Sequence, residues 1–280
     1  MSQTQITQAQ TAGANVPATI NPQEAAQILA AAGFDTKDMA EADLIQLAQI
    51  VRHELDTTKE GVDLQPTRIK INKDSCTFVD AFNASTDELR GVVVYKQKTR
   101  GLWKRGENIP LCSSLDGVTG TADDENKMAL CAACPHNAWG SGVDEAGNPT
   151  AGKACKEMRR VFIAQENSEL PVVLTLPPTS IKEFDKYISA RVSQGIPDTA
   201  AETVFRLVPM KSDANFQYAV VQPKLGKRLS PQEMLRFSKM RSTLRVAAAK
   251  MAVVADDYNA EAEEGAGAAV ASGAETKEPF

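Results

Sequence analysis

The sequence contains only two histidines, His53 and His136, and neither stands in a context typical of a catalytic site. We therefore do not expect catalysis by a histidine base or by a nucleophile paired with histidine. The chain also lacks a G-x-x-x-x-G-K-[ST] phosphate loop, a G-x-G-x-x-G turn after a strand and an H-E-x-x-H helix. We expect a protein that is not an enzyme, although scattered carboxylates and a lysine would suffice for a metal-dependent nuclease.

Long apolar runs are missing as well. No stretch of eighteen apolar residues occurs, and residues 1–20 have neither the basic start nor the apolar centre of a signal peptide. We interpret the protein as cytoplasmic. With 280 residues, of which 42% are hydrophobic, the chain can bury a substantial core.

Cationic residues are fewer than acidic residues in the whole chain, but they are concentrated in one region. The net charge is −5, yet residues 256–280 hold seven carboxylates and one lysine, so the remainder of the chain is at +1. Residues 66–110 contain nine cations and five acids. The acidic total therefore does not exclude a polyanionic partner.

The chain divides by its pattern into several segments. We expect residues 1–20 to be disordered and residues 21–60 to form a helical hairpin, with Asn21-Pro22 starting the first helix and Asp35 or Thr36 capping the second. The hairpin is either a docking or oligomerisation module or a cap on the main domain. Residues 256–280 are too acidic and too poor in large apolar side chains to fold alone.

From residue 66 the hydrophobic period changes to two, which indicates strands. We expect strands at 67–73, 75–82, 88–98, 159–165, 170–178, 202–211 and 215–223, a helix at 179–195 capped by Thr179 or Ser180, and a last helix from 231 to about 254. This order predicts an α+β domain over 66–254 with a mainly β core. A five-stranded Greek-key barrel of the OB type has this order, as do other α+β folds.

Four cysteines lie in one loop-rich region of about residues 106–157. Their spacing is C-x18-C-x2-C-x20-C, and they are Cys112, Cys131, Cys134 and Cys155. A C-x2-C pair presents two thiolates to one metal ion, and two further cysteines complete a tetrahedron. We expect one structural zinc ion here. Four protein ligands leave no open position for water, so this metal would not be catalytic.

Other interpretations of the cysteines remain open. An iron–sulfur cluster is one alternative, and His136 could replace Cys112 or Cys155 as a ligand. Disulfides are disfavoured in a chain without a secretion signal, and Pro135 directly after the C-x2-C pair argues against a redox motif. Cys76 lies in a strand pattern and is interpreted as a core residue.

Basic and aromatic residues occur together on one strand, on the loop after it and near the cysteines. Cations that follow phosphates and rings that stack on bases are the combination that holds single-stranded nucleic acid. The candidates are Tyr95, Lys96, Lys98, Arg100, Trp103, Lys104, Arg105, Trp139, Lys153, Lys156, Arg159 and Arg160. The alternative is that Tyr95 belongs to the core and the charges form a solvated strand face.

The acidic tail, which ends in Glu278-Pro279-Phe280, resembles the tail of single-stranded DNA-binding proteins of bacteria and their phages. In that family the terminal proline and phenylalanine dock on replication and repair proteins. The likeness covers the last 25 residues, and Lys277 departs from the purely acidic family tip. A DNA-binding core with a cysteine-bound metal resembles the single-stranded DNA-binding proteins of large phages. A phage origin would place the protein in a bacterial host cell.

The resemblance and the basic strand together imply non-enzymatic, sequence-tolerant binding and protection of single-stranded DNA in replication, recombination and repair. Partner enzymes would be recruited by Glu278, Pro279 and Phe280. One alternative is a zinc-containing regulatory or adaptor protein that binds other proteins. A second alternative is a nuclease or recombination enzyme.

Overall fold

The computed structural model describes residues 20–104, 106–122, 128–143, 147–166, 168–211 and 217–257. Residues 1–19, Arg105 and the tail from 258 onward, including Glu278, Pro279 and Phe280, lie outside the described residues. The chain separates into two compact units, residues 1–64 and residues 65–280.

The first unit is a pair of helices, α1 (Pro22–Ala31) and α2 (Glu41–Lys59). The Asn21 side chain accepts from the backbone N–H of Glu24 at 2.8 Å, so the predicted start of α1 is confirmed. The predicted capping of α2 is wrong, because α2 starts after Ala40 and Asp35 instead accepts from Lys37 N in a local turn. The small core of this unit consists of Ile20, Ala25, Leu29 and Ala48.

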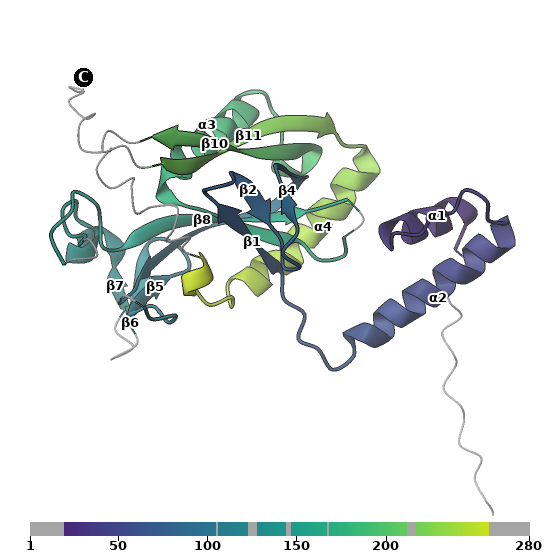
Figure 1. Cartoon of the computed structure of the whole chain (residues 1–280), viewed down its shortest axis with the longest axis horizontal. Helices are drawn as coiled ribbons and strands as arrows, with labels where there is room; N and C mark the ends of the chain where they lie inside the picture. The colour runs from purple at the N-terminus through teal and green to yellow at the C-terminus, as the bar shows by residue number, and fades with distance from the viewer. Residues whose placement is uncertain are drawn as a thin grey trace, which may run out of the picture. The chain divides into compact units, whose positions relative to one another are not determined.

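The second unit contains a mixed sheet (Figure 1). The strands are β1 (Thr67–Asn72), β2 (Thr77–Val79), β3 (Ser85–Thr86), β4 (Glu88–Leu102), β5 (Cys112–Ser114), β6 (Thr119–Ala122), β7 (Met128–Leu130), β8 (Lys156–Ala164), β9 (Val172–Leu176), β10 (Ala201–Lys211) and β11 (Gln217–Arg228). Their order is β3-β2-β1-β9-β8-β4-β5-β6-β7, and β10 pairs with both β4 and β11. The β1–β9 pair is parallel and the others are antiparallel.

The α+β class is confirmed, but the described strands form an open sheet rather than the expected five-stranded Greek-key barrel. The strand that connects the parts of this sheet is β4, the longest one described. Its first residues pair with β10, its middle with β8 and its last with β5, so one strand serves three neighbours. A further departure is the parallel β1–β9 pairing, which the order of elements alone does not reveal.

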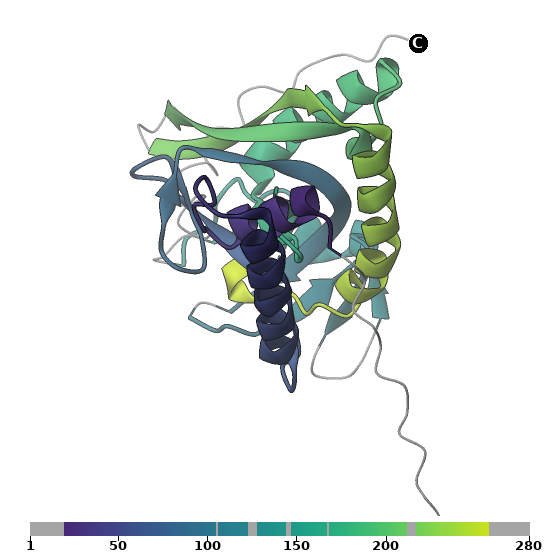
Figure 2. The ribbon, with the colours of Figure 1, turned by 90° about the vertical axis from the view of Figure 1, so that its right-hand side faces the viewer.

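One helix covers each face of the central strands. α3 (Pro178–Ser193) packs Phe184 and Ile188 against a cluster that includes Val93 and Val161. α4 (Pro231–Ala248) packs Phe237 and Leu244 against the neighbouring residues Val92, Val94 and Phe162. Successive strand residues point to opposite faces, so the two helices lie on opposite sides of β4 and β8. In Figure 2, α4 is the yellow-green helix that runs beside the sheet.

The helix ends differ in part from expectation. α4 starts with a capping box between Ser230 and Glu233 and ends at Ala248, earlier than predicted. α3 begins after Pro177 without a side-chain cap, because the Ser180 hydroxyl is buried and accepts from Val221 N in β11 at 2.9 Å. Among the described residues, none of the helices is both long and apolar enough to cross a membrane.

Candidate metal centre and nucleic-acid interface

The C-x2-C pair forms a tight local structure. Cys131 begins a 3₁₀ turn, Cys131–Ala133, and the N–H of Cys134 donates to its carbonyl at 3.3 Å. A second 3₁₀ turn, Pro135–Asn137, follows at once. Two long-range backbone bonds hold this knuckle: Cys131 N to Val118 O and Cys155 N to His136 O, each 2.8 Å. The backbone therefore brings the last cysteine beside the C-x2-C pair.

The first cysteine reaches the same place from the sheet. Cys112 lies on β5 and Cys131 follows β7, with β6 between these strands. A side-chain carbon placed on Gly120 of β6 would stand 2.9 Å from the Sγ of Cys112 and 3.7 Å from that of Cys131. Two thiols thus converge over a residue that has no side chain of its own.

The pKa of the Cys155 thiol reflects the groups around it. Burial raises the pKa of the Cys155 thiol to about 11, and the Arg100 charge opposes this. Cys131, Cys112 and Cys134 each raise the pKa further. All five cysteines of the chain are thiols, and four of them are therefore close enough to interact through their charges.

The donor set fits zinc, since four thiolates are the ligands of structural zinc sites. In the described residues no three Cys, His, Asp or Glu side chains stand at distances that would hold an ion. The four thiols therefore lie near one another, but not at the distances of a metal coordination sphere. The side chain of His136 is exposed, and its backbone carbonyl accepts from Cys155 N.

Cys76 stands apart from this group. It lies in the turn between β1 and β2 with a φ of 52°, so its predicted position in a strand is wrong. Its half-buried side chain packs against the main core, as expected, and burial raises the pKa of its thiol.

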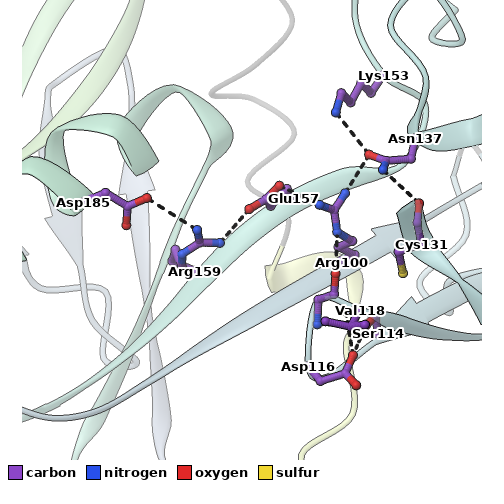
Figure 3. Close-up of polar contacts among 11 residues, drawn as sticks. Arg100, Ser114, Asp116, Val118, Cys131, Asn137, Lys153, Glu157, Arg159 and Asp185 are labelled. Carbon is purple, nitrogen blue, oxygen red and sulfur yellow. Dashed lines mark hydrogen bonds and ion pairs between the residues drawn. The ribbon is translucent and has the colours of Figure 1, made fainter. Parts of the chain in front are cut away.

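A polar network fastens the knuckle to the sheet (Figure 3). The Asn137 side chain accepts from Arg100 Nη1 at 2.7 Å and donates to the Cys131 carbonyl at 2.9 Å. Arg100 also donates to Gly117 O at 3.1 Å and to Glu157 at 2.8 Å. Arg100 therefore has a structural role, although its sequence context had suggested contact with DNA. Asn137 has no sequence signal that distinguishes it from other loop asparagines.

The turn between β5 and β6 is held by one carboxylate. Asp116 accepts from the N–H groups of Thr119 and Val118 at 2.8 and 2.7 Å, and from the Ser114 hydroxyl at 2.9 Å. These hydrogen bonds, that of Thr119 first, hold the pKa of Asp116 below its usual range. The turn keeps Gly117 against β4, where it receives the bond from Arg100.

Several predicted DNA-binding residues are used inside the protein. Arg159 is 8% exposed at its side chain and contacts Glu157 and Asp185, while Arg160 is fully buried against Asp257. Lys96 pairs with Asp198, and the Tyr95 ring lies 5.6 Å from that of Phe162 under α4. These internal contacts favour a structural role for all four residues.

The residues at the end of β4 also differ from expectation. The Trp103 ring folds back over Gly101, where an added side-chain carbon would stand 2.0 Å from it. Lys104 pairs with Glu107 at 3.3 Å, and Arg105 lies outside the described residues. Lys156 is half-buried on β8. Of the three described residues in this group, Lys104 is the exposed one.

Two of the predicted residues lie together beside the knuckle, and a third, Lys98, lies on β4. Trp139 is 65% exposed, and the Lys153 ammonium lies 5.0 Å from the centre of its ring. Lys153 also donates to Asn137 at 3.2 Å, and Lys98 is exposed on the same face of β4 as Arg100. We call Lys98, Trp139 and Lys153 the knuckle patch.

Comparisons with protein-family models, curated proteins and solved structures found no match for this chain.

Proposed function

We propose that this protein binds and protects single-stranded DNA without sequence preference and without catalysis, in replication, recombination or repair. The observation that carries the proposal is the exposed Trp139 ring with the Lys153 ammonium beside it. A ring that stacks on an unpaired base contributes roughly 1–3 kcal/mol, and an adjacent cation attracts the phosphates. Because every base has a flat face, such a site tolerates any sequence.

One structural zinc ion is part of the proposal, held by Cys112, Cys131, Cys134 and Cys155. When bound, zinc would supply folding free energy to a segment that has few apolar side chains. Arg100 and Asn137 orient the knuckle that carries two of these cysteines. The ion would thereby fix the position of Trp139, five residues after Cys134.

Recruitment of partner enzymes is assigned to Glu278, Pro279 and Phe280, on the basis of the resemblance of the tail to that of bacterial and phage single-stranded DNA-binding proteins. An apolar ring next to an acidic side chain is a combination that a pocket with a basic rim can capture. The proposal does not require an OB-type barrel. The knuckle patch consists of Lys98 on β4 and of Trp139 and Lys153 in the loops next to the knuckle, and none of these positions depends on a closed sheet.

A second candidate, an adaptor that binds proteins, is favoured by one observation. The α1–α2 hairpin is a separate unit with a small core, and Ile50 and Leu55 are 49% and 44% exposed. Exposed apolar side chains of this kind suit a protein partner.

The test is a titration with labelled oligo-dT and matching duplex at rising salt, with and without magnesium. We expect tight, salt-dependent binding to oligo-dT alone and no cleavage. Trp139→Ala should weaken binding about 5- to 150-fold, the equivalent of one lost stack. The control is Phe82→Ala, since Phe82 is 90% exposed on the loop after β2, away from the knuckle. Absence of binding at low salt would reject the proposal, and magnesium-dependent cleavage would identify a nuclease.

A further inference from the structure

The outward face of α4 has a stripe of polar and basic residues. At 100° per residue, positions spaced by three, four and seven residues fall on one side of a helix. The stripe consists of Gln232, Arg236, Lys239, Thr243 and, just past the end of α4, Lys250, all of which are exposed. It lies on a different side of the helix from Phe237 and Leu244, which face the sheet.

The charges of this α4 stripe are not compensated within the described structure. Residues 231–250 contain five cations and one acid, Glu233. The Glu233 carboxylate accepts from Ser230 N at 2.7 Å in the capping box. Arg241 faces inward, donating to Val94 O and pairing with Asp198. Among described residues, Arg236, Lys239 and Lys250 form no ion pair within 4.0 Å. The hydrogen bonds of Ser230 and the charge of Arg236 help to lower the pKa of Glu233, and the Arg236 guanidinium lies over the Phe237 ring.

The sheet separates the α4 stripe from the knuckle patch. Arg100 is joined through Glu157 to Arg159, which contacts Asp185 on α3, so the knuckle patch lies on the α3 side. Gln97, whose side chain points to the other face, donates to the carbonyl of Ala248 in α4 at 3.4 Å. The two basic surfaces therefore lie on opposite faces of β4 and β8.

We propose that the α4 stripe is a second surface for the sugar-phosphate backbone of single-stranded nucleic acid, so that one chain holds two strands, one on each face. This inference rests on the proposed function of the knuckle patch. The four stripe residues on α4 extend over residues 232–243, about 17 Å at 1.5 Å per residue, which is enough for more than one phosphate. Leu235 and Val246, 58% and 62% exposed, border it and offer apolar contact to bases.

A protein that holds two strands brings them together, which is the physical requirement for strand annealing. The test uses two oligo-dT molecules, one with a donor dye and one with an acceptor dye, mixed with the full-length protein. Wild type should give energy transfer, because non-complementary strands approach only through the protein. Arg236→Glu/Lys239→Glu should still bind one strand by anisotropy but lose the transfer. Trp139→Ala/Lys153→Ala should also lose the transfer.

The control is Lys182→Glu/Lys186→Glu, which reverses two exposed charges on α3 and should retain the transfer. For each cation removed, the salt dependence of second-strand binding should fall by about 0.7 in log–log slope. If the glutamate variant does not fold by circular dichroism, Arg236→Gln/Lys239→Gln replaces it.

The outcomes separate the two proposals. If no oligonucleotide binds to wild type, the proposed function fails. If one strand binds without energy transfer, the proposed function stands and the second surface is rejected. Transfer that survives the α4 substitutions shows that strands are bridged elsewhere, for example by self-association, and this result also overturns the inference.

Discussion

Arg160 and Asp257 lie 97 positions apart in the chain and form an ion pair in which both side chains are fully buried. Arg160 also donates to the carbonyl of Met251 at 2.7 Å, and Asp257 accepts from Val254 N at 3.0 Å. The pair thus attaches the segment after α4 to the centre of β8.

Asp257→Asn should strongly destabilise the protein. The substitution keeps the shape of the side chain but leaves the buried Arg160 charge uncompensated, which typically costs about 3–5 kcal/mol. The measurement is the free energy of unfolding in urea. Asp256→Asn is the matched control, because Asp256 is the exposed neighbour and its loss should change stability by less than about 0.5 kcal/mol. Equal stability of the two variants would contradict the structural role of the pair.

The same carboxylate predicts an acid-dependent loss of stability. Burial alone would raise the pKa of Asp257, but the hydrogen bond and charge of Arg160, with Val254 N and Arg68, hold it below its usual range. The unfolded chain therefore binds the proton more readily, at a pKa of roughly 3.9. The stabilisation is complete above that pH and is lost as the pH falls through the folded value.

Urea unfolding from pH 6 to pH 2.5 measures this effect. Wild type should lose stability below about pH 4 more steeply than Asp257→Asn, in which the titrating group is absent. Parallel curves for the two proteins would show that Asp257 does not contribute.

Cys131→Ser should abolish metal binding. Cys131 is buried in the knuckle, and the loss of one of four ligands opens the proposed tetrahedron. Elemental analysis of the purified protein should give about one zinc per chain for wild type and much less for the variant. Cys76→Ser is the matched control and should retain the metal, since Cys76 packs against the core away from the knuckle. Iron in place of zinc would indicate a cluster.

Arg100→Ala should loosen the knuckle from the sheet. Asn137, Gly117 O and Glu157 each lose a donor, and hydrogen bonds that involve a charged group contribute about 1.5–3 kcal/mol each at most. Limited proteolysis should then cut faster between residues 131 and 155. Lys98→Ala, on the same strand face but exposed, should have little effect. Arg100→Lys should not restore protection, because lysine lacks the planar fork that reaches three partners.

Deletion of residues 278–280 should separate the two proposed activities. Oligo-dT affinity should be retained, while co-purification of replication and repair proteins from a bacterial host should be lost. Phe280→Ala should reproduce this loss, since the proposal assigns the ring to the partner's pocket, and Val270→Ala within the same tail should not. A deletion that abolishes oligo-dT binding would contradict the assignment of these residues to partners.

The local sequence was sufficient for many elements of this fold. Asn21-Pro22 and Ser230-Pro231 mark helix starts that the structure contains, since each cap is formed by residues three positions apart. The period of two located the main strands, because alternation is a property of a single strand. The length of β4 and its three partners were not predictable, since pairing depends on segments distant in the chain.

The candidate site divides in the same way. By itself the sequence determined the C-x2-C spacing and the cations on β4 and β8, because these depend only on neighbouring residues. The tertiary structure alone decided which cations face solvent. Arg160 is buried because Asp257, 97 positions away, meets it under the end of α4, whereas Lys153 stays beside an exposed Trp139. A buried charge is stable only with a partner, and that partner is placed by the fold.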